Sequence, residues 1–418
     1  MRIRASIGLS LPLLLIASAP AQDDMRDVVT RTDGKVVTGR VAIPTAADEL
    51  LVLQGGRRVR IARKEIAAID LVADRVREFC RRRIAHKDNE RAQWFLVDWA
   101  ESRGLPGLAR AQAMLLALDH DHEGAHEFLG HRKAGKEWLW KYDGRDVAPG
   151  KLAELIGKKG IEIAGERFVV RCNDGLRANV AALLDLEQLG ATFYQRFGAA
   201  LQLEETLRPM TIEVARNGNE FDKWGFRPAP YYVPPPHGDE GRTFYAGVAP
   251  TRPEKLFFVG TQALLYRSLI GEVDQRSDRD RVCAWLEVGL GMLMENTMQG
   301  AAGYAFAGDL QLPQRTALTA LGRSFRLGSL LHLPMYGGFY LMDDTPTAIH
   351  WASATMLVAW LLDDDNKPAT REPFLDYVRQ ALGDKKGDSS SLFDQVMGRR
   401  IEEMDEPWVK WLEKKAGY

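Results

Sequence analysis

The chain carries one string with the spacing of a zinc-protease motif, His122-Glu-Gly-Ala-His126. Two histidines four residues apart lie one turn apart on a helix and can hold Zn²⁺, and the glutamate between them acts as general base. The context of this string is polar, because Asp119-His-Asp121 precedes it and predicts a helix N-terminus. Gly124 also weakens a helix where the motif needs one. We therefore expect a structural cap and surface histidines.

The alternative is a metallohydrolase with zinc bound at His122 and His126 and with Glu123 as its base. The longer pattern HExxHxxGxxH fails, since Gly130 and His131 fall out of register. A third ligand would have to come from the glycine-rich segment that follows, where Glu154 is the candidate.

A second region has the surroundings of a zinc-protease helix without its ligands. Its strands and helices resemble the peptidase MA-like family of gluzincin-type zincins over roughly residues 165–415. Arg167–Asn173 and the helix Leu176–Phe197 resemble that domain's opening strand and helix. Met210–Trp224 resembles its second strand and turn, and Gly241–Val248 the strand that leads to its active-site helix.

The family then has a segment like L-A-H-E-x-T-H-x-L-L, and further along a segment like W-L-x-E-G-L-A-x-Y-x-E. This chain reads Leu256-Phe-Phe-Val-Gly-Thr-Gln-Ala-Leu-Leu265 and Trp285-Leu-Glu-Val-Gly-Leu-Gly-Met-Leu-Met-Glu295. In register, the four functional positions of the family are occupied by Phe258, Val259, Gln262 and Val288. Glu287 is one residue from the third-ligand position, a rotation of about 100° on a helix.

The resemblance implies a scaffold with neither zinc nor a catalytic residue, because Phe and Val cannot coordinate a metal and Gln alone is a weak donor. The function we expect is that of an exported, non-catalytic pseudopeptidase that binds or scaffolds in the cell envelope. Its partner would be an envelope protein, a peptide or a glycan. An aromatic groove for such a partner would be lined by Tyr304, Tyr336, Phe339 and Tyr340.

The elements that would position these sites predict an α+β chain in several parts. Residues 1–21 read as a signal peptide, with Arg2 and Arg4, an apolar stretch and an Ala19-Pro-Ala21 cleavage pattern. We expect a secreted or periplasmic protein, with no later apolar run long enough to span a membrane. The parts that follow are a small SH3-like or Sm-like β-barrel (22–71), a tetratricopeptide-like helical hairpin (72–134), a linker (135–160) and the zincin-like domain (161–418).

Composition restricts the partners. The 418 residues carry 56 Lys+Arg against 57 Asp+Glu, so bulk charge gives no case for nucleic acid or an anionic membrane. The basic strip Arg57, Arg58, Arg60, Arg63 and Lys64 is expected to be a solvated face. The three cysteines are far apart and odd in number, which does not suit a disulfide framework.

Overall fold

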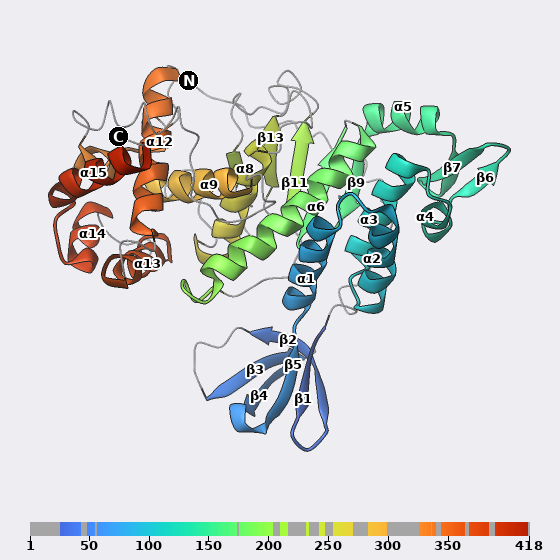
Figure 1. Ribbon diagram of the computed structural model, residues 1–418, viewed down its shortest axis with the longest axis horizontal. Helices are drawn as coiled ribbons and strands as arrows, with labels where there is room; N and C mark the ends of the chain where they lie inside the picture. Colours follow the sequence, from blue (N-terminus) through green and yellow to red (C-terminus); the bar gives the residue numbers. More distant parts are fainter. Residues whose placement is uncertain are drawn as a thin grey trace, which may run out of the picture.

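The computed structural model describes residues 26–42, 48–54, 57–173, 175–203, 210–215, 231–233, 242–246, 254–270, 283–298, 326–335, 337–339, 344–363, 368–383 and 389–416. Helices dominate over small sheets, and the α+β class expected from the sequence is confirmed (Figure 1). Within these ranges, no helix combines the length and the apolar composition that crossing a bilayer requires.

The first sheet is antiparallel, with strand order β4-β3-β2-β1-β5. Its strands are β1 (Asp27–Arg31), β2 (Val36–Ala42), β3 (Glu49–Gln54), β4 (Arg57–Ala62) and β5 (Ile66–Asp70). Strands β4 and β5 are its edges, so the described strands form an open sheet and not a closed barrel. A small core of its own, which includes Val29, Leu50 and Val52, holds the sheet together.

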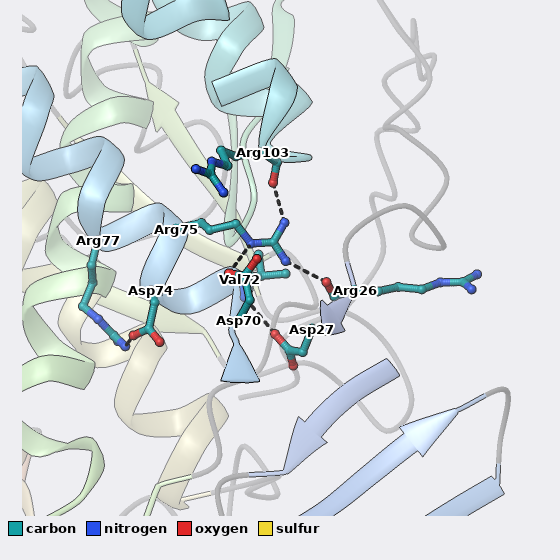
Figure 2. Close-up of polar contacts among 8 residues, drawn as sticks. All are labelled: Arg26, Asp27, Asp70, Val72, Asp74, Arg75, Arg77 and Arg103. Carbon is teal, nitrogen blue, oxygen red and sulfur yellow. Dashed lines mark hydrogen bonds and ion pairs between the residues drawn. The ribbon is translucent and has the colours of Figure 1, made fainter. Parts of the chain in front are cut away.

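A polar joint connects this sheet to the helices, and Figure 2 shows most of its contacts. The Asp27 carboxylate accepts from the backbone N–H of Val41 at 2.7 Å and from that of Val72 at 2.8 Å. Arg75 donates to the Arg26 carbonyl at 2.7 Å and to the Arg103 carbonyl, and its Nε lies 3.3 Å from Asp70. The β1–β5 sheet and the helices that follow it therefore share one hydrogen-bond network, at the point where β5 is followed by the first helix.

The next part is formed by helices. They are α1 (Val72–Ala85), α2 (Glu90–Ser102), α3 (Pro106–His120) and the short α4 (Glu123–Phe128). Asn89 caps α2 by accepting from the Ala92 N–H at 3.0 Å, and Pro106 begins α3 at a position where no N–H is needed. Helix α3 packs against both α2 and α4.

The segment expected to be a linker is folded. It forms an antiparallel sheet of β6 (Arg132–Ala134), β7 (Glu137–Tyr142) and β8 (Arg145–Val147), followed by α5 (Pro149–Lys159). The β7–β8 turn is Asp143-Gly144 with φ values of 52° and 70°, the left-handed pair that a tight hairpin needs. The glycine-rich composition therefore reflects turn chemistry.

The last part holds a mixed sheet with strand order β12-β13-β11-β10-β9. Strands β10, β11 and β13 are parallel, whereas β9 and β12 run antiparallel at its edges. The strands are β9 (Ile161–Ala164), β10 (Phe168–Cys172), β11 (Met210–Ala215), β12 (Tyr231–Val233) and β13 (Arg242–Ala246). The predicted strands Arg167–Cys172, Met210–Ala215 and Thr243–Val248 correspond to β10, β11 and β13.

Long helices surround this sheet. Helix α6 (Leu176–Phe193) crosses the middle of the molecule and packs against α1, α3, α8 and β10 (Figure 1). The other described helices are α8 (Glu254–Leu265), α9 (Ala284–Met298), α11 (Leu327–Leu331), α12 (Asp344–Leu361), α13 (Pro368–Gly383), α14 (Ser389–Met397) and α15 (Asp405–Ala416).

Buried charges hold α6 in place. Glu187 is fully buried, and its Oε1 accepts from the backbone N–H groups of Arg167 at 2.7 Å and Phe168 at 3.1 Å. The Arg167 guanidinium lies 3.6 Å from the same carboxylate. Glu166 accepts from the Leu108 N–H at 3.2 Å, and burial raises the pKa of Glu166 to about 8. These contacts attach α6 and α3 to the start of β10.

Candidate functional site

The two segments expected from the sequence to correspond to a zinc centre form α8 and α9, which pack together. Phe258, Gln262 and Tyr266 follow one another at intervals of four residues and face α9. Gln262 Nε2 donates to Glu287 Oε1 at 2.6 Å, and the Tyr266 hydroxyl donates to Glu287 Oε2 at 3.1 Å. Gln262 and Glu287 are both fully buried. Phe258 lies against Gly291, where a Cβ atom would come within 2.7 Å of its ring.

On α9, the resemblance predicts that Val288 occupies the third-ligand position and that Glu287 is rotated away from it. In the structure Glu287 is the residue that faces α8 and contacts Gln262. Val288 and Val259 are fully buried apolar side chains. A carboxylate therefore does lie beside the position of the second family histidine, but it is used as an acceptor for an amide and a hydroxyl.

Aromatic packing fills the side of the site next to α12. The Phe258 ring stacks on Trp351 at 4.9 Å between centroids and 23° between planes. The Trp351 indole donates to the Phe339 carbonyl at 2.7 Å. Phe339 is fully buried, so it belongs to this core and does not line an open groove. The other expected groove residues, Tyr304, Tyr336 and Tyr340, lie outside the described residues.

The His122–His126 string does not assemble a zinc site. His122 is the N-cap of α4, where its Nδ1 accepts from the Ala125 N–H at 3.1 Å and its ring stacks on Trp94 at 4.7 Å. His126 Nε2 lies 3.1 Å from Asp121 Oδ1, and its Nδ1 lies 2.8 Å from His131 Nδ1. Both nitrogens of His126 are therefore already used by the protein.

Glu123 and Glu154, the expected base and third ligand of the alternative zinc site, form ion pairs with lysines instead. Glu123 pairs with Lys133 at 3.1 Å on the surface, and Glu154 pairs with Lys151 and Lys158 along α5. In the part of the chain that the structure describes, no three His, Cys, Asp or Glu side chains are grouped so that they could hold a metal ion.

His126 and His131 are buried among indoles, although we expected surface histidines. The His126 ring lies parallel to Trp138, with centroids 4.6 Å apart and 3° between planes, and His131 packs on Trp140 at 4.2 Å. Burial lowers the pKa of His126, and burial together with the neighbouring His126 lowers the pKa of His131 to about 4. Both rings are neutral at pH 7. A proton on His126 Nε2, facing Asp121, makes His126 Nδ1 the acceptor and His131 Nδ1 the donor.

A cavity of about 740 Å³ opens beside this pair. Its walls come from the end of α3, from α4, β7 and α5, and from the start of α6. They include Leu118, His126, Trp138, Trp140, Leu152, Ile156 and Leu176. This volume is typical of small-molecule sites. Sequence reasoning missed the cavity because it treated residues 135–160 as a linker. The signal that could have revealed it is the alternation of Trp138, Trp140 and Tyr142, all buried on one face of β7.

Comparisons with known proteins give no relative from which a role could be transferred: no protein-family model matches the chain, and no curated protein matches it.

Proposed function

We propose that residues 161–416 form a zincin-like domain without a metal site, and that the exported protein acts by binding or scaffolding in the cell envelope. The observation that carries this proposal is the contact between Gln262 and Glu287. It joins, within hydrogen-bond distance, the two segments that the resemblance assigns to a single metal centre.

The order of elements supports the same proposal. The resemblance requires a strand and a helix, a second strand, a strand that leads to the active-site helix, and then the helix of the third ligand. The chain has β10, α6, β11, β13, α8 and α9 in that order, with α8 and α9 packed together. On α8, the residues at both histidine positions, 258 and 262, lie on the face turned toward α9.

The residues present do not fit zinc. Zn²⁺ in proteins takes four ligands from thiolates, imidazoles and carboxylates, or three with a water. The facing side chains supply one carboxylate (Glu287), one amide (Gln262), one phenol (Tyr266) and a phenyl ring (Phe258). Position 259, where the family has its base, holds a fully buried valine. A hydrolytic step through a metal therefore has no support in this pair of helices.

The alternative hydrolase at His122, Glu123 and His126 is less well supported. Its two histidines cap a helix and bond a neighbouring imidazole, and its glutamate forms a surface ion pair. For the pseudopeptidase, the partner remains an envelope protein, a peptide or a glycan, which is the range that the sequence suggested.

The proposal is tested by restoring the ligands. In the double variant Phe258→His/Gln262→His, both imidazoles would face Glu287 and complete a two-histidine, one-carboxylate set. We expect this variant to gain about one zinc per chain, and to lose it when Glu287→Gln is added. Zinc is measured by elemental analysis, with circular dichroism as the check on folding.

The matched control is Phe257→His/Thr261→His. It places the same two residues one position earlier on α8, rotated by about 100° away from Glu287. It should bind no zinc. A double variant at 258 and 262 that is folded and does not bind zinc would contradict the proposed scaffold.

A further inference from the structure

The edge strand β4 and the turn after it carry a concentration of positive charge. Arg57, Arg58, Arg60, Arg63 and Lys64 are all exposed. Glu65, the one carboxylate in the stretch 57–65, is paired with Arg31 at 2.9 Å. Among the described residues, one of these five cations forms an ion pair: Arg60 lies 3.8 Å from Glu49, and both side chains are exposed. Such pairs stabilise little, so the strip keeps its positive charge.

The same strand offers an open backbone edge. In the order β4-β3-β2-β1-β5, β4 has a neighbour on one side only among the described strands. An exposed edge of this kind presents N–H and C=O groups that a further strand can pair with. In Figure 1 the lobe of β1–β5 stands apart from the helices.

The face beside this edge combines charge with apolar surface. Residues two apart on a strand share a face, so Arg58 and Arg60 point to the side opposite the buried Ile61. Their cross-strand partners are Leu53 and Leu51, which are half-buried on the same outer face. Arg58 and Arg60 are separated by about 6.6–6.8 Å along the strand, which is the repeat of alternate residues on any paired strand.

We propose that β4 binds an extended acidic peptide, which adds to the sheet as a strand and places acidic side chains at alternate positions opposite Arg58 and Arg60. Main-chain hydrogen bonds provide affinity in such strand addition, and side chains at alternate positions provide specificity. Charge complementarity selects carboxylates. The open backbone edge of β4 favours a peptide over a phosphate polymer, which has no N–H groups to pair with a strand. The proposal is independent of the zincin-like domain, since it concerns the other lobe.

The test uses the full chain and a fluorescent 12-residue peptide of alternating Glu and Val, with binding followed by anisotropy. The double variant Arg58→Glu/Arg60→Glu should weaken binding by about tenfold or more. The matched control Arg91→Glu/Arg145→Glu reverses two exposed arginines outside the sheet and should bind like the wild type.

A second peptide separates strand addition from simple charge attraction. It has the same sequence, with alternate backbone nitrogens methylated on the pairing edge, and should bind at least about tenfold more weakly, since it cannot form the ladder. Hydrogen exchange of the β4 amides should slow when the unmodified peptide binds. Equal binding of both peptides, undiminished binding by the double variant, or no binding by the wild type would overturn the proposal. Equal competition by inorganic polyphosphate would favour a polyanion site instead.

Discussion

The α8–α9 interface and the α4–β7 cluster (His126, His131, Trp138 and Trp140) both bury polar side chains among aromatic rings. They differ in the polar group that is buried, which is a carboxylate in the first and a pair of imidazoles in the second. Between α8 and α9, one buried carboxylate, Glu287, accepts from an amide and a hydroxyl. Between α4 and β7, two neutral imidazoles share a hydrogen bond, and one of them also contacts an exposed carboxylate, Asp121. In the first region, the two helices that we propose to correspond to a zinc site lack its ligands. In the second region, the residue string of such a site is present, but its side chains are not arranged to bind a metal.

This difference shows that a metal-binding motif requires a particular side-chain geometry in addition to its sequence pattern. Two histidines four apart become a pair of ligands only if both lie within one helix, on one face, with free nitrogens. His122 is the N-cap of α4, where its Nδ1 accepts from the Ala125 N–H, and His126 uses both ring nitrogens in contacts with Asp121 and His131. In contrast, residues 258 and 262 both face α9, but one is a phenylalanine and the other is a glutamine bonded to Glu287.

The largest expected effect lies in the α8–α9 interface. Glu287→Ala removes the acceptor of two buried donors, Gln262 and Tyr266, and leaves a cavity. We expect the free energy of unfolding to fall by about 4 kcal/mol. Glu287→Gln keeps the volume and one acceptor oxygen and should lose clearly less. Urea unfolding followed by circular dichroism measures both. A loss below about 1 kcal/mol for the alanine variant would show that this contact does not hold the helices together.

The α4–β7 cluster should respond to pH. In the folded state the pKa of His131 is lowered to about 4 from 6.5, first by burial and then by His126, with Arg110 and Lys141 adding to the effect and Asp146 opposing it. Between these values the unfolded chain binds a proton that the folded chain does not. Stability from this group is therefore complete above pH 6.5 and is lost as pH falls toward 4, by up to about 3 kcal/mol.

The comparison of wild type with His131→Gln isolates this group from the carboxylates that titrate in the same range. Urea unfolding at pH 7, 6, 5 and 4 should give a shallower pH dependence in the variant, even if the variant is less stable throughout. Parallel curves for the two proteins would mean that His131 is not held neutral in the fold.

The N-cap role of His122 predicts the smallest effect. His122→Ala removes the acceptor for the Ala125 N–H and the stack on Trp94, and should lower the free energy of unfolding by about 1 kcal/mol. His122→Asn restores a capping side chain and should recover part of this loss. Thermal unfolding is sensitive enough to see it. If zinc protected the wild type and not the alanine variant, the histidine would be a ligand and not a cap.

Much of the helical part of the fold is readable in the sequence. Apolar positions at intervals of three and four predicted the helix Leu176–Phe197, which the structure has as α6 followed by a π-helical turn, Tyr194–Gly198. The spacing of apolar residues along a helix is a local property of the sequence, so the helix can be predicted without knowing what it packs against.

The remainder depends on contacts between distant residues. The strands β6–β8 are short and glycine-bounded, and their pairing is stabilised by burial of Trp138 and Trp140 against α4, which the sequence alone does not reveal. Because the β6–β8 sheet was not predicted, His126 and His131 were expected to be exposed, whereas both are buried. On α9, the sequence alone does not reveal that Glu287 contacts Gln262, because this contact depends on how α8 packs against α9.

We propose that this chain has a zincin-like scaffold without its metal. The most direct test of this proposal is the zinc content of the purified protein, measured by elemental analysis after exposure to zinc and removal of the free ion. We expect far less than one zinc per chain and no change in thermal unfolding on adding a chelator. Close to one zinc per chain, lost in the variant His122→Ala/His126→Ala, would contradict the account and make the protein a metallohydrolase candidate.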